Sequence, residues 1–525
     1  MLRTILLATI AACCGSGSSA GDPCTFDSAQ RIGSPGYDIG FDIDLNENGD
    51  RIVGGAFSST ATFAPGVTRT VVGLEDLFIA KYASDGALVF VTTTGAGDLE
   101  GVNDLKFTSD GGAIACGYFV GNVPFGSEVL SASGLDAWVA KVSPSGQFEW
   151  ARRAGGTGLE EARGVVVDED GNSYVAGYFN NTATFAPGVT RTSAGNADIY
   201  LAKYSPSGDL IWVTAVGGSG FDSSEGIALD PNGDPIVVGR FQNTVNFQPG
   251  GVGGSVVSNG SSDVFVAKFD ATTGLVDWVR GAGSNGTDRG VGVGSDSSGA
   301  VYITGCFRNT IDFSGVVLSA QNNDDMFLVK YDANGALVWA QRAATTLSFV
   351  QGLGLDSNLR GDIAVTGYLG GTTTFGDAAF GPTTQVVSAG SFDAFVATFD
   401  ADGALRCAVR GGGGGFSADY GFGVAINEAG EVAATGEFSG AATFGEFNLS
   451  AAAQDVWFAT LPAHDIAIPG DLNGDGVVNF TDLNLVLSNF GSSGTPGMTA
   501  GDANGDGVVD FSDLNIVLSN FGAGS

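Results

Sequence analysis

The sequence predicts an all-β fold, a seven-bladed β-propeller, followed by a small α-helical domain built around two calcium loops. Three observations support this prediction. Glycine supplies 85 of the 525 residues, a strand-rich unit recurs along most of the chain, and a twelve-residue acidic loop occurs twice near the C-terminus. Hydrophobic residues make up 43% and aromatic residues 10%, which is enough to form a core rather than a disordered chain.

The first residues resemble an export signal. One early arginine is followed by an apolar run over residues 4–12 and then by small residues. A signal peptide is therefore predicted over residues 1–20, with cleavage after Ala20. The alternative is lipoprotein cleavage before Cys13, where the sequence IAAC resembles a lipobox and would attach a lipid to Cys13. Both alternatives predict a secreted or cell-surface protein.

The charge balance limits the kinds of partner. Lys and Arg total 22 against 57 Asp and Glu, which gives a formal net charge of −35. Such a chain repels phosphate backbones and anionic lipid headgroups and attracts divalent cations. Nucleic acid is therefore not expected as a partner. No second long apolar stretch follows the leader, so no transmembrane span is expected.

Self-comparison of the sequence defines the repeat. The segment TATFAPGVTRT occurs at 60–70 and again at 182–192, an offset of 122 residues that corresponds to two units of about 61. The second strand of each unit carries an aligned glycine: Gly55, Gly117, Gly177, Gly239, Gly305, Gly367 and Gly436. The third strand starts at an aligned aspartate: Asp76, Asp136, Asp198, Asp263, Asp325, Asp393 and Asp455. Both sets count seven units, and we expect the aspartates to cap strands by accepting backbone N–H bonds.

The remaining strands complete a four-stranded unit. Third strands such as DVFVAKFD at 263–270 alternate faces with a period of two. Fourth strands carry a large aromatic residue that we expect to fill the space between stacked sheets: Phe90, Trp150, Trp212, Trp278 and Trp339. The seventh unit lacks this strand, and residues 26–36 align with 148–158. The N-terminal segment is therefore predicted to complete the last blade of a closed ring.

Four cysteines remain after cleavage at Ala20. Cys116 and Cys306 lie in apolar strand patterns and are predicted to be buried free thiols. The sequence does not decide how Cys24 and Cys407 pair.

Units such as RGVVVDEDGNSYVAGYF followed by ADIYLAKYSPSGDLIWVTAVGG resemble the bacterial seven-bladed β-propeller repeat family, over residues 24–462. The resemblance implies an exported binding or structural module. The sixth and seventh units depart from the pattern. Thr398 and Thr460 replace the usual Lys, and Cys407 stands where Trp is expected.

The two acidic loops have the ligand spacing of an EF-hand-like calcium site. Calcium prefers six to eight oxygen ligands, and such loops supply them from positions 1, 3, 5, 7, 9 and 12 with glycine at position 6. In the first loop these positions are Asp471, Asn473, Asp475, Val477 through its carbonyl, Asn479 and Asp482, with Gly476 at the bend. In the second loop they are Asp502, Asn504, Asp506, Val508, Asp510 and Asp513, with Gly507 at the bend. Two bound Ca²⁺ ions are predicted.

Each loop leads into a predicted helix, over 481–491 and 512–522, and nothing helical precedes either loop. In the first helix Leu483, Val486, Leu487 and Phe490 are expected to form one apolar stripe. Residues 471–525 contain seven Asp and no Lys, Arg or Glu. Without metal these carboxylates repel one another around a very small core, so folding of this domain is expected to follow calcium binding.

Paired loop and helix units of this kind resemble type I dockerins, over residues 470–522. The resemblance implies a domain at 471–522, reached through a linker at 463–470, that binds a cohesin-like protein. Cellulosomal dockerins often carry a hydroxyl pair at loop positions ten and eleven. Here those pairs are Phe480 with Thr481 and Phe511 with Ser512. The near-identical halves predict two equivalent docking orientations.

These features predict an exported binding or structural protein. Its propeller would bind polysaccharide or another surface protein, and its calcium module would attach it to a cohesin-like partner. A homotypic calcium clasp is a second hypothesis. A carbohydrate-active enzyme, a glycoside hydrolase or lyase with two carboxylates in the propeller channel, is the alternative, but the sequence nominates no catalytic pair. The single histidine, His464, lies outside the repeats, which excludes a Ser-His or Cys-His triad within them.

Overall fold

The computed structural model describes residues 24–96, 98–247, 254–345, 349–415, 418–463, 472, 478–493, 500–503 and 508–521. The chain divides into two compact units, Met1–Ala463 and His464–Ser525. The predicted signal peptide at 1–20 and residues 464–470 of the predicted linker lie outside the described residues. In the described part of the chain, none of the helices has the length and apolarity needed to cross a bilayer.

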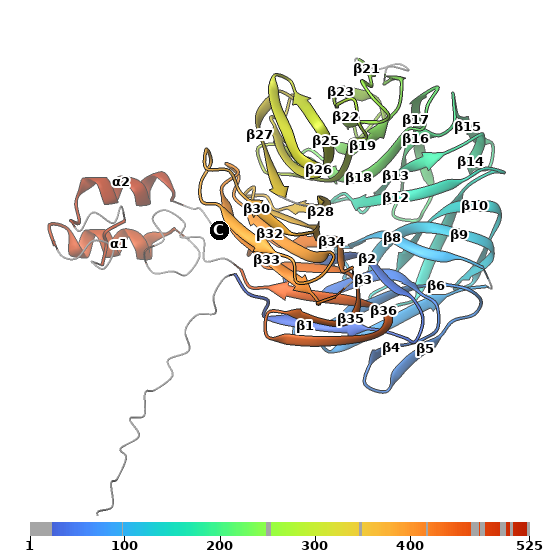
Figure 1. Ribbon diagram of the computed structural model, residues 1–525, viewed down its shortest axis with the longest axis horizontal. Coiled ribbons are helices and arrows are strands. Elements are labelled where there is room, and N and C mark those ends of the chain that lie inside the picture. The colour runs from blue at the N-terminus through green and yellow to red at the C-terminus, as the bar shows by residue number, and fades with distance from the viewer. Residues whose placement is uncertain are drawn as a thin grey trace, which may run out of the picture. The chain divides into compact units, whose positions relative to one another are not determined.

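The first unit is built from antiparallel strands arranged in a propeller-like manner (Figure 1). The innermost strands are β2 (Asp38–Leu45), β8 (Glu100–Phe107), β12 (Glu160–Val167), β18 (Ser223–Leu229), β24 (Arg289–Ser295), β28 (Val350–Ser357) and β34 (Tyr420–Ile426). The second strands are β3 (Arg51–Phe57), β9 (Ala113–Phe125), β13 (Ser173–Phe179), β19 (Pro235–Phe241), β25 (Val301–Phe313), β29 (Ile363–Leu369) and β35 (Val432–Phe444).

Third and fourth strands extend each sheet outward. The third strands are β6 (Asp76–Tyr82), β10 (Glu128–Val142), β16 (Asp198–Tyr204), β22 (Asp263–Phe269), β26 (Val316–Tyr331), β32 (Asp393–Phe399) and β36 (Phe447–Leu461). The fourth strands are β7 (Leu88–Thr94), β11 (Phe148–Ala154), β17 (Leu210–Gly218), β23 (Val276–Ala282), β27 (Leu337–Thr345) and β33 (Leu405–Gly412). From the aligned aspartate onward, the third strands are almost entirely buried on both faces, because neighbouring sheets cover them on either side.

Short outer hairpins and two helices complete the described elements. The hairpins pair β4 (Thr60–Ala64) with β5 (Val67–Thr70), β14 (Thr182–Ala186) with β15 (Val189–Thr192), β20 (Thr244–Asn246) with β21 (Ser255–Val257), and β30 (Thr372–Phe375) with β31 (Thr384–Val387). The helices of the second unit are α1 (Phe480–Asn489) and α2 (Phe511–Ser519). The repeated segment TATFAPGVTRT forms the hairpins β4–β5 and β14–β15.

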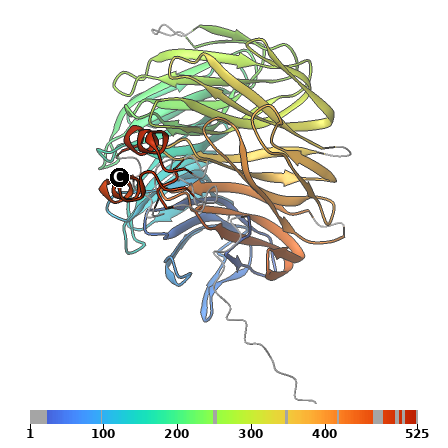
Figure 2. The ribbon, with the colours of Figure 1, turned by 90° about the vertical axis from the view of Figure 1, so that its left-hand side faces the viewer.

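The innermost strands contact one another in chain order, from β2 to β8 and on through β34, and β34 in turn contacts β2. Each sheet therefore packs face to face with its two neighbours. Figure 2 shows the twist of these sheets in a second view.

The N-terminal strand β1 (Ser28–Ile32) pairs antiparallel with β36, so the first and last strands of this unit share a sheet. In the register Ala29 lies opposite Ala459. The side chain of Arg31 forms an ion pair with Asp455, and the hydroxyls of Ser28 and Thr460 lie within hydrogen-bonding distance.

The structure confirms that the aromatic residues of the fourth strands fill the space between sheets. Trp150 and Trp339 are buried, and Phe90, Trp212 and Trp278 pack against buried clusters. Each indole also donates to a backbone carbonyl in the turn of the following unit. Trp150 Nε1 lies 3.0 Å from the Pro206 oxygen, and Trp278 Nε1 lies 3.2 Å from the Ala333 oxygen.

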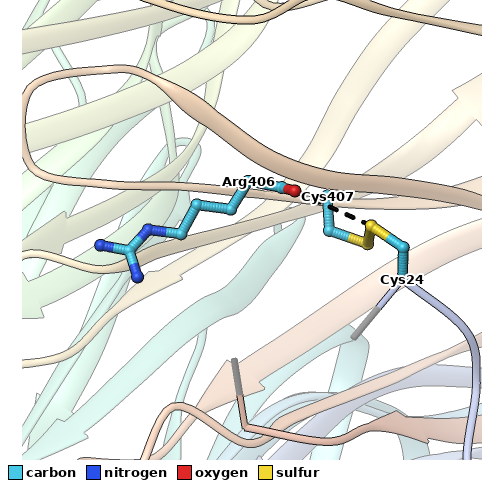
Figure 3. The surroundings of a disulfide bond; sticks show 3 residues. All are labelled: Cys24, Arg406 and Cys407. Atoms are coloured by element: carbon cyan, nitrogen blue, oxygen red, sulfur yellow. Dashed lines mark hydrogen bonds between the residues drawn. A yellow bond between two sulfur atoms is a disulfide. The ribbon is translucent and has the colours of Figure 1, made fainter. Parts of the chain in front are cut away.

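The cysteines divide into two kinds. Cys116 and Cys306 are buried and unpaired, which confirms that prediction. Cys24 and Cys407 form a disulfide, with Cα atoms 5.3 Å apart (Figure 3). Cys407 is buried in β33, so the substitution of the expected Trp by Cys provides an anchor for the N-terminal segment.

Candidate functional site

The calcium loops of the second unit are described in part. The predicted ligands Asp471, Asn473, Asp475, Val477, Asn504 and Asp506 lie outside the described residues. The predicted ligands Asn479, Asp482, Asp502, Val508, Asp510 and Asp513 are described. In the described part of the chain no cluster of three or more His, Cys, Asp or Glu residues forms a complete metal site.

The end of each loop is also the start of a helix. Asn479 caps α1 by accepting the Thr481 N–H at 2.7 Å, and Asp482 accepts the Asn479 N–H at 2.9 Å. A second carboxylate oxygen of Asp482 accepts the Leu472 N–H at 2.8 Å, which ties the beginning of the loop to its end. This reciprocal pattern is a capping box with Asp in place of Glu.

The second loop repeats this geometry. Asp510 accepts the Ser512 N–H at 2.7 Å, and Asp513 accepts the Asp510 N–H at 2.8 Å. Both closing carboxylates, Asp482 and Asp513, are fully buried. Residues 471–525 contain no basic side chain that could compensate this charge. The donor set therefore fits a bound divalent cation, which would supply the missing positive charge.

The two helices pack on a very small core. Val478, Val486, Val509 and Val517 are fully buried, with Leu472, Leu483 and Leu514 packed against them. The predicted stripe is thus partly wrong, because Leu487 and Phe490 are exposed. The aromatic side chains instead pair on the surface, with Phe480 against Phe521 and Phe490 against Phe511, each pair with ring centroids 5.0 Å apart. These matched pairs reflect the internal symmetry of the module.

The first unit contains a central cavity of about 450 Å³ that is lined by all seven innermost strands. One side of the cavity is acidic. Asp42, Asp104 and Asp356 line it together with Lys106, whose Nζ lies 3.6 Å from Asp44. Burial raises the pKa of Asp42 well above its ordinary value, and the neighbouring charge of Asp104 raises it further. Burial likewise raises the pKa of Asp104, and raises that of Asp356 to about 6.

These carboxylates also bridge neighbouring strands. Asp42 accepts the Leu105 N–H at 3.1 Å, and Asp104 accepts the Val165 N–H at 2.7 Å. The carboxyl groups of Asp42 and Asp104 lie close enough for each to shift the pKa of the other. Five of the seven innermost strands have glycine at the equivalent position, so these two aspartates break the repeat.

The opposite side of the cavity carries arginines. Arg163 Nε lies 2.6 Å from Glu161, and Glu225 lies 3.4 Å from Arg240 Nε. Arg289 also lines the cavity, and among the described residues its guanidinium has no ion pair. The cavity thus combines carboxylates, guanidinium groups and one ammonium group around one opening at the centre of the unit.

The seven aligned aspartates lie at the edge of each sheet and act largely as predicted. Five accept the backbone N–H of the residue four positions earlier, as Asp76 does from Val72 at 2.9 Å. Asp136 instead pairs with Arg153, and Asp455 pairs with Arg31. The capping prediction is therefore confirmed for five units, and two of these five aspartates, Asp325 and Asp393, also form ion pairs with arginine.

A second ring of carboxylates was missed in the sequence. It lies at the beginning of the innermost strands and comprises the buried residues Asp38, Glu100, Glu160, Asp222, Asp288 and Asp419. Asp222, for example, accepts N–H bonds from Gly218 and Gln242. Burial raises the pKa of Glu100 to about 8, that of Glu160 to about 7 and that of Asp222 to about 6. The only signal in the sequence is an acidic residue after each glycine-rich turn. Such a residue cannot be told apart from an ordinary exposed acidic residue by sequence alone.

Comparison with known proteins gives distant relatives for the first unit. An uncharacterized WD repeat-containing protein of Acanthamoeba polyphaga mimivirus is 24% identical over 475 residues, covering 73% of this chain and 34% of that protein. The regulatory protein FlaEY of Caulobacter vibrioides is 25% identical over 325 residues, covering 56% of this chain and 32% of that protein. The chain thus spans about a third of the length of each relative.

Solved structures give weak likenesses. The RRP9 WD40 repeats align with a TM-score of 0.39 at 9% identity, covering 84% of this chain and 99% of that chain. An ulvan lyase, a polysaccharide lyase, aligns with a TM-score of 0.33 at 9% identity, covering 66% and 81%. At these scores neither likeness indicates a function. The C-terminal segment is matched specifically: residues 469–521 fit the family model of the dockerin type I domain, and the chain therefore carries a dockerin domain at its C-terminal end.

Proposed function

We propose that this is an exported protein whose first unit binds a ligand or partner and whose dockerin domain attaches it to a cohesin-like protein in the presence of calcium. The duplicated loop and helix carry this proposal. Each copy places a fully buried carboxylate, Asp482 or Asp513, at the junction of an acidic loop and a helix. Dockerin domains bind cohesins, so the match at residues 469–521 supports this kind of partner.

We further propose that each loop holds one Ca²⁺, through the ligands predicted from the loop positions. The bound ion would neutralise the loop carboxylates. Asp482 and Asp513 would present their carboxylates from fixed positions, because N–H bonds already hold them at the helix starts. Asn479 and Asp510, the predicted ligands at the ninth position of each loop, are also the N-caps of α1 and α2.

The first unit is proposed to be a closed seven-bladed β-propeller. The circular contacts of the innermost strands and the pairing of β1 with β36 support this arrangement. Closure through an N-terminal strand leaves no open sheet edge between the first and last units. The repeat family resembled by residues 24–462 implies the same architecture.

Export is proposed from the predicted signal peptide, with lipid attachment at Cys13 as the alternative. The disulfide between Cys24 and Cys407 supports an oxidising compartment, because such bonds persist mainly outside the cytosol. Proteins with dockerin domains are typically extracellular or attached to the cell surface, which agrees with both alternatives.

The exposed face of the dockerin domain supports two docking orientations. Phe480 and Phe511 are 71% and 69% exposed, at equivalent positions of the two halves. A partner that contacts one of them could contact the other after a half-turn of the module. Because these positions differ from the hydroxyl pair of many cellulosomal dockerins, we propose a cohesin with an apolar contact surface.

The alternative function is a carbohydrate-active enzyme. The cavity supplies carboxylates, but those of Asp42 and Asp104 interact directly with each other. Glycoside hydrolases hold their two carboxyl groups about 5 Å apart or about 6.5–9.5 Å apart. In addition, each of the two aspartates accepts a backbone N–H across a strand boundary. This geometry favours a bridging role for the pair over acid and base catalysis.

Surface plasmon resonance tests the proposed function. The full chain is passed over a panel of immobilised type I cohesin modules in calcium and then in EGTA. We expect calcium-dependent binding to at least one cohesin. It should persist in Phe480→Ala or Phe511→Ala alone and be lost in the double variant. Calcium-dependent self-association on size-exclusion chromatography, with no cohesin bound, would instead support the homotypic clasp.

A further inference from the structure

A β-bulge occurs at the same place in every innermost strand. In β2 the register with β3 shifts between Gly40 and Asp42, which leaves Phe41 as the extra residue. Equivalent shifts occur in β8, β12, β18, β24, β28 and β34. A bulge turns its extra side chain away from the normal alternation of the strand, and bulges are frequent beside functional sites.

The aligned glycines of the second strands are the partners of these bulges. A Cβ atom at Gly55 would collide with the carbonyl oxygen of Ile39, two residues before the bulge residue Phe41. The same collision would arise between Gly177 and Glu161 and in the other five units. The repeated glycine is therefore required because the bulge turns a carbonyl group toward it. Every unit therefore has the same bulge and the same glycine opposite it.

The side chains at the bulges, in contrast, differ from unit to unit. All of them line the central cavity: Phe41, Asn103, Arg163, Glu225, Val291, Leu353 and Phe422. We call these residues the bulge ring. The backbone at the bulges is the same in every unit, but the side chains are not. A ligand site in a repeat protein requires this combination, because a ligand without sevenfold symmetry needs a different contact from each unit.

The bulge ring has two distinct arcs. Val291, Leu353, Phe422 and Phe41 come from consecutive units around the ring and form an apolar arc. The rings of Phe41 and Phe422 lie with centroids 6.0 Å apart. Asn103, Arg163 and Glu225 come from the remaining consecutive units and form a polar arc. The cavity thus presents one apolar wall and one polar wall to a ligand between them.

Polar groups outside the bulge positions of the cavity wall can both donate and accept hydrogen bonds. Arg289 lines the cavity with a guanidinium that has no ion pair among the described residues. Asp42, Asp104 and Asp356 add acceptors on the acidic side. A ligand with many hydroxyl groups along its edge can hydrogen-bond to both the donors and the acceptors of this wall, because each hydroxyl can donate and accept. A purely apolar ligand would leave these groups unpaired, at a cost in binding free energy.

We propose that the bulge ring binds a neutral saccharide of about one or two sugar rings. A pyranose has an apolar face of C–H groups and a rim of hydroxyls, which match the aromatic arc and the polar arc respectively. The cavity volume of about 450 Å³ lies within the range of about 300–1,000 Å³ for small-molecule sites. A neutral ligand is also compatible with a chain of net charge −35, which disfavours polyanions. This inference rests on the proposed binding role of the first unit and names its ligand class.

Saturation-transfer difference NMR and isothermal titration calorimetry of the full chain test the inference, with calcium held constant. The probes are cellobiose, xylobiose, mannobiose and chitobiose. We expect at least one disaccharide to bind, with saturation transferred mainly to the C–H protons of one sugar face. Phe422→Ala should weaken binding at least tenfold by removing one of the two aromatic rings of the apolar arc, and Glu225→Gln should weaken it several-fold by replacing one of two acceptor oxygens with a donor.

Tyr37→Ala is the matched control, because Tyr37 is an aromatic residue that is 65% exposed and does not line the cavity. The Tyr37→Ala variant should bind the disaccharide with the same affinity as the wild type. The inference is overturned if the folded chain binds none of the four disaccharides. It is also overturned if decanoate binds in their place, or if Tyr37→Ala weakens binding as much as Phe422→Ala. Cohesin binding by the same preparations separates this outcome from failure of the proposed docking function.

Discussion

Cys24 and Cys407 form a disulfide that joins residues 383 positions apart in the sequence. Cys24 precedes β1, which pairs with β36, whereas Cys407 lies in β33. The N-terminal segment is therefore held to the last two units, to β36 of the seventh through backbone hydrogen bonds and to β33 of the sixth through the disulfide. This arrangement explains why the sixth unit has Cys in place of the aromatic residue of other units.

Removal of this disulfide should destabilise the first unit. The double variant Cys24→Ser/Cys407→Ser is expected to lose about 2–5 kcal/mol in the free energy of unfolding, because the bond restricts a very long loop in the unfolded chain. Guanidinium denaturation under oxidising conditions measures the loss. Each single variant should lose nearly as much as the double variant, since either change breaks the same bond. If the losses of the two single variants instead add up to the loss of the double variant, the two cysteines do not form a stabilising disulfide.

The buried carboxylates should make stability depend on pH. Glu100, Glu160 and Asp222 have folded-state pKa values of about 8, 7 and 6, above the value of about 4 in an unfolded chain. The folded state thus keeps protons that the unfolded chain has released. Their contribution is complete below about pH 4 and is lost progressively as the pH rises from about 4 to the folded-state pKa of each group, so it is fully lost above about pH 8. Each such proton changes stability by about 1.4 kcal/mol per pH unit.

Calorimetry between pH 5 and pH 8.5 checks this, in saturating calcium and about 1 M NaCl, where the Debye length of about 3 Å screens the general negative charge. The melting temperature should fall as the pH rises. Glu100→Gln should flatten the dependence, whereas Asp85→Asn, in an exposed turn, should not. An identical slope in Glu100→Gln would show that general charge repulsion causes the effect.

The close approach of innermost strands should make some glycines intolerant of a side chain. A Cβ atom at Gly226 would collide with the carbonyl oxygen of Val291 in the next unit. Gly226→Ala is therefore expected to cost about 1–3 kcal/mol, as in other overpacked sites. Among the described residues, no atom lies within 4 Å of a Cβ added at Gly254, so Gly254→Ala should leave stability unchanged or slightly higher. Urea denaturation measures both variants. An equal change in the free energy of unfolding for Gly226→Ala and Gly254→Ala would argue against tight packing between neighbouring units.

The closing carboxylates of the dockerin domain should control calcium binding. Asp482→Asn and Asp513→Asn are each expected to abolish one calcium site in the full chain, because each removes a buried negative charge from its loop. Calorimetric titration measures the stoichiometry, and far-UV circular dichroism reports the loss of helix. Asp402→Asn, in an exposed propeller turn, is the control. Two intact sites in both variants would exclude these residues as ligands.

The sequence by itself determined the repeat, the β-rich character of the first unit and the two loop and helix copies, because these follow from local periodicity and residue spacing. It placed the strand-capping aspartates and the buried thiols Cys116 and Cys306, since both depend mainly on patterns within one strand. It also located the two helices, predicted over 481–491 and 512–522, to within a few residues of α1 and α2, because each follows directly from a local loop and apolar pattern.

Only the tertiary structure decided which distant residues meet. The pairing of Cys24 with Cys407, the contact of Asp42 with Asp104 and the bulge ring all join different units, and local patterns carry no record of such contacts. The glycine at position 55 shows the division clearly. Its recurrence counts the units, but the reason for it lies in the carbonyl group of Ile39 on the neighbouring strand, which a bulge turns toward it.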